Sequence, residues 1–293
     1  MRARATRKPP GERVSARVAL ATCAELPQLG QDEPLLLHAL RDRGVAVEPA
    51  VWDDRSVDWD SYELVVVRSV WDYAPRRDQF VAWAQSMPRV LNPAEVIAWN
   101  TDKRYLGEIP GAVDTTFIAP GEPWDPPAGE YVVKPTISAG SIDTARYRPG
   151  EGDRARRHVA GLLNAGSHVI VQPYLGAVDE HGETALLFFG GRYSHAVRKG
   201  PMLRAGRGPA TGLYVEEEIH AREPSAAERE AAERALDAMP WPREELLYAR
   251  VDLIPGPDGA PRLVELELAE PSLFLSYSPG APQRLAQVIE SRL

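Results

Sequence analysis

Tyr248–Ile254 reads YARVDLI and Arg262–Glu267 reads RLVELE, and these two stretches organise the interpretation of the chain. Between them lies Pro255–Pro261 (PGPDGAP), a segment dense in turn-forming residues. Two runs of alternating residues that flank such a segment are typical of a β-hairpin. We therefore expect two adjacent antiparallel strands at this position.

The expected hairpin brings three carboxylates together. Glu265 and Glu267 are two residues apart, so they share one face of their strand. Asp252 shares a face with Arg250 for the same reason. Crowded carboxylates repel one another unless a cation lies between them, and hard oxygen ligands suit Mg²⁺. The alternative is a charged, solvated hairpin edge, so other parts of the chain must decide between the two.

Size and composition bound the class of protein. With 293 residues the chain exceeds the usual size of one domain, so two or three lobes are expected. A net charge of -8 argues against a nucleic-acid partner. The single Cys23 fits a reducing compartment. No apolar run approaches the roughly 18 residues that cross a membrane. Met1–Arg13 is basic without an apolar core, so we expect a disordered arm on a cytoplasmic protein without a membrane partner.

The first part of the chain is typical of a parallel sheet. Apolar strands are expected at Arg17–Thr22, Val45–Trp52 and Glu63–Arg68, with a helix that begins at Pro34. Strands that alternate with a helix imply an α/β lobe with crossover connections. Ligands of such sheets bind beyond the carboxyl ends of the strands.

The residues after the third strand are candidates for a substrate site. Arg68, Ser69, Trp71 and Asp72 lie there, and together they could bind a small polar zwitterion. An equally acceptable interpretation is an ordinary loop with a packed arginine and packed aromatic rings.

A second lobe is expected after the Pro/Gly-rich stretch Pro120–Gly129. Its strand Tyr131–Lys134 ends on a lysine, and a lysine at the end of a buried strand is costly unless it meets an anion. The loop that follows contains small residues whose backbone N–H groups could approach phosphate oxygens: Ser138, Ala139, Gly140 and Ser141. It does not match the Walker pattern.

The remaining patterns predict further elements. Gly190-Gly191 predicts a hairpin that joins Glu183–Phe189 to Tyr193–Lys199, in which His195 is expected to be structural. The loop 200–212 is a candidate lid. Ser225–Glu228 is a capping box at the start of a helix. Asn100 or Thr101 is expected to cap another helix, over 102–106.

Several short motifs follow one another in a recognisable order. They are NTDK at 100–103, VVKP at 132–135, VQPYL at 171–175, HAVRK at 195–199, and the acidic hairpin. Each motif is weak by itself, but the series resembles the ATP-grasp ligases of the glutathione-synthetase-like branch. Within that branch the chain is similar to the cycloserine-pathway cyclo-ligases that act on O-ureido-serine. The resemblance runs from Asn92 to the C-terminus.

This resemblance implies a fold and its divisions. The fold class is α/β, with an N-terminal parallel-sheet substrate domain at 14–92 after the arm at 1–13. A small central lid lobe would span 93–172, and an antiparallel-sheet catalytic lobe would span 173–293.

The resemblance also implies roles for single residues. Lys103 and Lys134 would contact the phosphates of ATP, and the Ser138–Ser141 loop would cover them. The hinge that seats adenine would consist of Gln172, Pro173, Tyr174 and Leu175, and Glu183 would bind the ribose.

For catalysis, the resemblance implies that Asp252, Glu265 and Glu267 bind two Mg²⁺ ions, which Mn²⁺ could replace. Relatives often have Asn where this chain has Glu267. Arg250 would steady the transferred phosphoryl group or the acceptor carboxylate. Lys199 would lie near the phosphates, with Arg198 beside it.

The implied activity is an ATP-dependent carboxylate–amine ligase that activates a small amino-acid-like carboxylate as an acylphosphate and releases ADP. The bond would form between two substrates or by ring closure, with Ser272 beside the acceptor. The alternatives are a small-molecule kinase and a catalytically silent nucleotide-binding module. A homo-oligomer is also possible on this interpretation.

Overall fold

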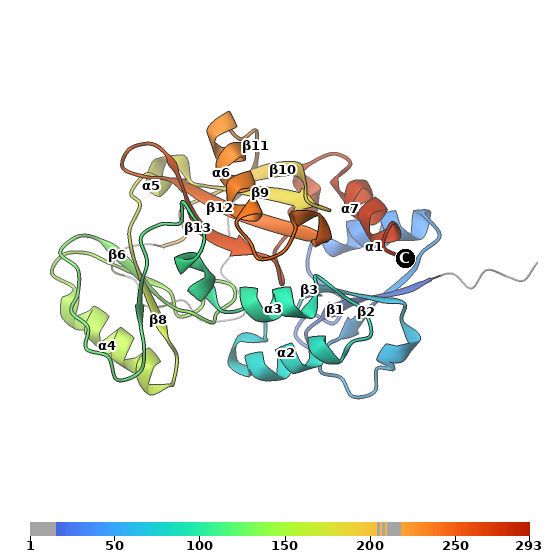
Figure 1. Ribbon diagram of the computed structural model, residues 1–293, viewed down its shortest axis with the longest axis horizontal. Helices are drawn as coiled ribbons and strands as arrows, with labels where there is room; N and C mark the ends of the chain where they lie inside the picture. The colour runs from blue at the N-terminus through green and yellow to red at the C-terminus, as the bar shows by residue number, and fades with distance from the viewer. Residues whose placement is uncertain (1–15, 204–205, 207–208, 210–217) are drawn as a thin grey trace, which may run out of the picture.

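The computed structural model describes residues 16–203, 206, 209 and 218–293, which form three sheets with their covering helices (Figure 1). The expected arm Met1–Arg13 lies outside the described residues, as does most of the candidate lid at 200–212. Within the described ranges, no helix is both long and apolar enough to cross a membrane.

The N-terminal lobe is built on a parallel sheet, as predicted. Its strands are β1 (Arg17–Thr22), β2 (Ala46–Val51), β3 (Leu64–Ser69) and β4 (Val90–Leu91), in the order β2-β1-β3-β4. All residues of β3 are buried, because helices cover both faces of the sheet.

Alternation along β1 explains how those helices are placed. Val18 and Leu20 join one core with α1 (Glu33–Asp42), whereas Ala19 and Ala21 join another with α2 (Arg77–Ser86). Figure 1 shows α1 and α2 on opposite sides of this sheet. The short helix α3 (Ala94–Asn100) leads out of the lobe.

The central lobe is a small antiparallel sheet covered by one helix. Its strands are β5 (Thr116–Ile118), β6 (Tyr131–Pro135), β7 (Ala145–Tyr147) and β8 (Val169–Pro173), in the order β5-β8-β6-β7. Helix α4 (Gly152–Asn164) packs on it through Ala155, Val159 and Leu162.

The C-terminal lobe contains an antiparallel sheet with the order β11-β10-β9-β12-β13. The strands are β9 (Glu183–Phe189), β10 (Arg192–Lys199), β11 (Ile219–Arg222), β12 (Tyr248–Pro255) and β13 (Pro261–Glu267). Both predicted hairpins, β9/β10 and β12/β13, are confirmed. The fold class predicted from the sequence is therefore confirmed.

Two helices sandwich this sheet, because β9 alternates between them. Leu186 and Phe188 pack toward α6 (Ala226–Asp237), while Leu187 and Phe189 pack toward α7 (Ala281–Glu290). The capping box predicted at Ser225–Glu228 opens α6. Helix α7 in turn contacts α1, which ties this lobe to the first one. The remaining elements are short helical turns: α5 (Val178–His181), η1 (Trp59–Ser61), η2 (Ala74–Arg76), η3 (Lys103–Gly107), η4 (Arg243–Glu245) and η5 (Leu275–Tyr277).

Strand β13 is the edge of its sheet, and a preceding part of the chain satisfies its outer backbone. Asn100 donates from Nδ2 to the carbonyl of Leu266 at 2.7 Å and accepts from the amide of Leu268 at 2.7 Å. The hydroxyl of Tyr105 also donates to the Leu266 carbonyl at 2.7 Å. An uncovered edge strand would offer these groups to other chains.

This arrangement corrects the helix-cap assignment. The sequence pattern favoured Asn100 or Thr101 as the cap of a helix over 102–106. The cap is instead Asp102, and the segment forms the 3₁₀ turn η3 (Lys103–Gly107). Asn100 has a different partner because its amide pairs with β13.

A second asparagine joins the first and last lobes. Asn92 donates to the carbonyls of Tyr248 and Leu268 at 2.9 and 2.6 Å, and it accepts from the amide of Leu247 at 2.6 Å. The hydroxyl of Tyr248 donates to the carbonyls of Val67 and Ala269 at 2.5 and 2.9 Å. Buried backbone groups on both sides of the seam are thereby paired.

Replacing Asn100 should therefore weaken the whole assembly. In Asn100→Ala the buried amide of Leu268 loses its partner, and such a loss costs about 1–3 kcal/mol. Urea unfolding measures the difference. The matched control is Asn164→Ala, because Asn164 is exposed at the end of α4 and should change little. Equal stability of the two variants would contradict the role given to Asn100.

Candidate active site

A cavity of about 1260 Å³ lies where the three lobes meet. Most of the residues singled out in the sequence line it, although they come from segments far apart in the chain. They are Trp71, Lys103, Lys134, Ser138, Ala139, Gly140, Ser141, Gln172, Pro173, Tyr174, Leu175, Glu183, Lys199, Arg250, Glu265, Glu267 and Ser272. The fold thus brings these residues to one place.

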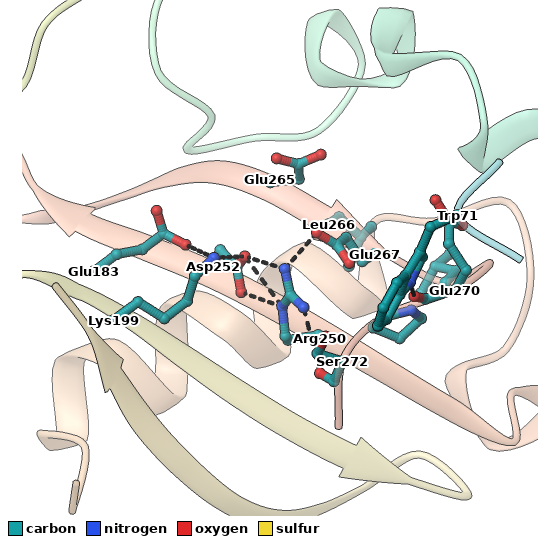
Figure 2. A network of polar contacts seen from close by, with 12 residues as sticks. Trp71, Glu183, Lys199, Arg250, Asp252, Glu265, Leu266, Glu267, Glu270 and Ser272 are labelled. Carbon is teal, nitrogen blue, oxygen red and sulfur yellow. Dashed lines mark hydrogen bonds and ion pairs between the residues drawn. The ribbon is translucent and has the colours of Figure 1, made fainter. Parts of the chain in front are cut away.

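The floor of the cavity is a network of charges centred on Arg250 (Figure 2). Its Nε and Nη2 both donate to the carboxylate of Asp252 at 2.9 Å, and Nη2 also pairs with Glu267. Arg250 Nη1 reaches the carbonyl of Ser272 at 3.3 Å. The cause is the strand register, in which Arg250 is opposite Glu267 and Asp252 is opposite Glu265.

Lys199 extends this network toward β9. Its Nζ lies 3.1 Å from Asp252 Oδ2 and 2.6 Å from Glu183 Oε1. Burial would raise the pKa of Asp252, but Arg250 and Lys199 outweigh it and keep that pKa below its ordinary value. Asp252 therefore stays charged, although it is fully buried.

Two other carboxylates are shifted in the opposite direction. Burial raises the pKa of Glu267 to about 8, against the charge of Arg250 and with the help of Glu265 and Asp252. Burial also raises the pKa of Glu183 to about 7, against Lys199. The carboxylates are crowded enough that an additional cation in the cavity would stabilise their ionised forms.

Lys103 links the small-residue loop to β13. Its Nζ donates to the carbonyl of Ser138 at 2.6 Å and lies 3.2 Å from Glu265 Oε1. Lys134 lines the same wall, and burial lowers its pKa. In the part of the chain that is described, Lys134 has no ion pair, so an anionic ligand would be its natural partner.

The carboxylates fit Mg²⁺ only in combination with other ligands. No group of three acidic, histidine or cysteine side chains among the described residues is arranged to hold a metal ion. Mg²⁺ usually takes one or two protein carboxylates together with phosphate oxygens and water. Glu265 and Glu267, which line the cavity beside the lysines, supply such a pair. Asp252 does not line the cavity, and its assignment as a third ligand stays a prediction.

The expected hinge is held by polar contacts on both sides of the boundary between the central and C-terminal lobes, and Arg146 crosses that boundary. Gln172 Nε2 donates to Thr115 Oγ1 at 3.0 Å, and the Tyr174 hydroxyl donates to Asp179 Oδ1 at 2.6 Å. The guanidinium of Arg146 lies 3.4 Å from the centre of the Tyr174 ring, which it covers on one side. Adenine binding at this hinge stays a prediction.

Besides Asp252, four predicted residues do not reach the cavity, because each side chain has protein partners elsewhere. Arg68 is 1% exposed and pairs with Glu33 at 2.9 Å and with the carbonyl of Pro271. Ser69 accepts from the amide of Gly30, Asp72 pairs with Trp52 and Arg76, and Arg198 donates to carbonyls of α5. Direct substrate contact by these side chains has no support in this geometry.

Other residues that the sequence patterns did not indicate do line the cavity. Among them are Glu33, Glu270 and Phe274. Glu33 is the first residue of α1, and Glu270 follows Glu267 by three residues. Glu270 lies past the end of β13, where alternation along a strand no longer predicts a direction.

The loop 268–277 forms one wall of the cavity, and side chains from two lobes fix it. His195 on β10 lies 3.0 Å from the carbonyl of Leu273 through Nε2. Asp32 accepts from the amides of Leu275 and Ser276 at 3.0 and 3.4 Å. Burial lowers the pKa of His195 to about 4, so its imidazole is neutral and structural.

The chain is similar to proteins of one family over nearly its whole length. A family model described as the N-terminal domain of the D-cycloserine synthetase DcsG matches residues 18–92. The cycloserine biosynthesis protein DcsG of Streptomyces lavendulae is 40% identical over 294 residues, which cover 94% of this chain and 98% of that protein. A crystal structure of D-cycloserine synthetase DcsG has a TM-score of 0.86 at 39% identity and covers 94% of this chain and 99% of that one.

More distant structures share the fold. D-alanine–D-alanine ligase from Bacillus anthracis, complexed with ATP, has a TM-score of 0.61 at 14% identity, with 94% and 97% of the two chains covered. The ATP-grasp ligase PsnB, complexed with its minimal precursor, Mg and ADP, has a TM-score of 0.59 at 15% identity, with 96% and 99% covered. The fold is that of an ATP-grasp ligase.

The chain belongs to the DcsG family of ATP-grasp ligases. The prediction of an ATP-dependent ligase that forms a carbon–nitrogen bond is thereby confirmed, and ATP and Mg²⁺ are the cofactors of this class. The kinase and silent-module alternatives are set aside.

His195 should make the stability of the protein depend on pH. Its pKa is about 4 in the folded protein and about 6.5 when unfolded, so the unfolded chain binds the proton first. Stability should fall as pH drops from 6.5 to 4, by up to about 1.4 kcal/mol per pH unit from this group. His195→Gln should flatten that slope in urea unfolding series, whereas His38→Gln, at an exposed position, should not. Identical slopes in the two variants would refute this assignment.

Proposed function

We propose that the protein activates the carboxylate of an O-substituted serine-type amino acid with ATP and closes a ring by attack of the substrate's own nitrogen. The whole-length relation to a D-cycloserine synthetase supports ring closure over the joining of two substrates. The observation that carries the proposal is that Lys103, Lys134, Arg250, Glu265 and Glu267 line one cavity.

In this proposal the lysines bind the nucleotide. Lys134 lacks an ion pair within the described ranges, so a phosphate oxygen would replace the water it lost on burial. Lys103 is fixed by Ser138 and Glu265, which orients its ammonium toward the same wall. The Ser138–Ser141 loop covers the phosphates, the 172–175 hinge seats adenine, and Glu183 binds the ribose.

Glu265 and Glu267 would hold Mg²⁺ together with phosphate oxygens. The bound ion supplies charge neutralisation for the phosphates during transfer. That two ions bind, and that Mn²⁺ can replace them, are parts of the same proposal. The raised pKa of Glu267 is consistent with a site that is completed by a cation.

Arg250 would place the substrate carboxylate for transfer. Its three partners, Asp252, Glu267 and Ser272, fix the guanidinium on the cavity floor. A carboxylate oxygen attacks the γ-phosphorus of ATP, and the bond to ADP breaks. The substrate nitrogen then attacks the acyl carbon, the bond from that carbon to the phosphate oxygen breaks, and the departing phosphate takes the proton that the nitrogen gives up.

Two further expectations accompany this proposal. The single cysteine, Cys23, is free and buried, which is consistent with a reducing, cytoplasmic setting. Self-association of the chain is proposed without a particular interface.

Turnover tests the proposed function directly. Protein, ATP and Mg²⁺ with O-ureido-serine should release ADP, and added hydroxylamine should trap a hydroxamate. Mass spectrometry identifies the hydroxamate and the cyclic product. A stable phosphorylated product without hydroxamate would contradict acylphosphate chemistry, and absence of ADP release would contradict the substrate.

Glu265→Gln should abolish turnover without unfolding the protein. The amide keeps the shape but loses the charge that faces Lys103 and the metal, so kcat should fall by at least ~100-fold. Circular dichroism and thermal unfolding check the fold. Glu95→Gln, at an exposed position on α3, is the control and should keep full activity. Full activity in Glu265→Gln would contradict the metal assignment.

A further inference from the structure

Most charges that line the cavity are matched within the protein. Glu33 pairs with Arg68, and Asp32 accepts hydrogen bonds from the loop backbone. The remaining pairs join cations to carboxylates of the C-terminal sheet: Lys103 with Glu265, Lys199 with Glu183 and Asp252, and Arg250 with Asp252 and Glu267. This pairing leaves few charges for a ligand to meet.

Apart from Asp32, whose carboxylate accepts hydrogen bonds from the loop backbone, two cavity-lining charges remain without an ion-pair partner in the described part of the chain, Lys134 and Glu270. The two side chains carry opposite charges, so they would bind different groups of a ligand, an anionic one at Lys134 and a cationic one at Glu270. Lys134 interacts mainly with the charges of Glu265, Lys103 and Glu183, which the proposed function places around the nucleotide and its metal. Glu270 also interacts with the charges of Lys103 and Glu265, but it is on the far side of Arg250 from Glu183, as Figure 2 shows.

The backbone around Glu270 is fixed from the N-terminal lobe. Trp71 Nε1 donates to the carbonyl of Glu270 at 3.0 Å, and Arg68 Nη2 donates to the carbonyl of Pro271 at 2.9 Å. The carboxylate interacts with the hydroxyl of Tyr73, a neutral group that does not cancel its charge. Two residues further on, the carbonyl of Ser272 contacts Arg250.

Burial opposes the charge of this carboxylate. It raises the pKa of Glu270 to about 7, although the charge of Lys103 and the Tyr73 hydroxyl act against it. A cationic group beside Glu270 would restore the ionised form and would itself be held by a charge-assisted hydrogen bond. Arg250, which meets a carboxylate in the proposed function, is on the same cavity floor.

We propose that Glu270 binds the α-ammonium group of the amino-acid substrate. Arg250 takes the carboxylate of that substrate and Glu270 takes its ammonium, so the two residues together select an α-amino acid. This assignment rests on the proposed function. It adds a residue that determines which carboxylates are activated.

The test compares two compounds in two proteins. Wild type and Glu270→Gln are given ATP, Mg²⁺ and either O-ureido-serine or 3-(ureidooxy)propanoate, which lacks the amino group. Wild type should prefer the amino compound, and Glu270→Gln should lose about 10- to 100-fold of that preference, chiefly through KM. The KM for ATP and the Mg²⁺ dependence should not change. Glu270→Asp should restore part of the preference, and Glu95→Gln should behave as wild type.

Several results would overturn the assignment. An unchanged preference, or equal loss on both compounds, would show that Glu270 does not contact the amino group. A changed Mg²⁺ dependence alone would place Glu270 at the metal instead. Thermal unfolding shows whether Glu270→Gln loses activity because it is less stable. If it is, the preference of Glu270→Asp for the amino compound decides whether the assignment holds.

A binding experiment separates this assignment from the proposed function. Calorimetry with D-cycloserine and with isoxazolidin-3-one, its counterpart without the amino group, needs no turnover. Tighter binding of D-cycloserine by wild type but not by Glu270→Gln supports the assignment, even if wild type releases no ADP from O-ureido-serine. Equal binding of both compounds by wild type, or no binding of either, overturns it.

Discussion

The unpaired edge of β13 is the constraint on which the rest of the structure depends. This strand positions Glu265 and Glu267. The backbone of Gly111 and Val113 pairs with its outer side near the start of the strand, and near its end that side is satisfied by the side chains of Asn100 and Tyr105. Because Lys103 lies between those two residues, the turn that covers the edge also delivers a cation to Glu265. One local requirement for hydrogen bonds therefore sets the geometry of charges from two lobes.

The cavity is arranged as a set of matched charges that a ligand can rearrange. Fixed ion pairs keep Asp252 ionised in a fully buried position, while burial makes Glu183, Glu267 and Glu270 easier to protonate. A polar site that is organised before the ligand arrives does not have to reorganise during reaction. In our proposal the nucleotide, its metal and the amino acid complete this arrangement.

Much of the fold could be predicted because long alternating strands leave a clear pattern. The β9/β10 and β12/β13 hairpins and the cap of α6 follow from alternation, Gly-Gly and Ser-x-x-Glu. Strands β5 and β7 have three residues each, which is too short to show the alternation of apolar and polar residues that identifies a strand. At the site, the tendency of ligands to bind beyond the carboxyl ends of parallel strands indicated the loop after β3. It could not show that the side chain of Arg68 is buried against Glu33. Glu270 was not predicted because it follows the end of β13, where tertiary contacts and not strand alternation determine which way a side chain points.

The contacts of Asn92, Asn100 and Tyr105 also define what can be exchanged between related enzymes. These side chains belong to the connection between the first two sheets, yet their partners lie at 247–248 and 266–268 in the last sheet. A chimera that takes its first sheet from one relative and its last from another separates donors from acceptors that are 155 to 176 residues apart. The interchangeable module is therefore discontinuous in sequence, and the connection at 92–105 must travel with the C-terminal strand.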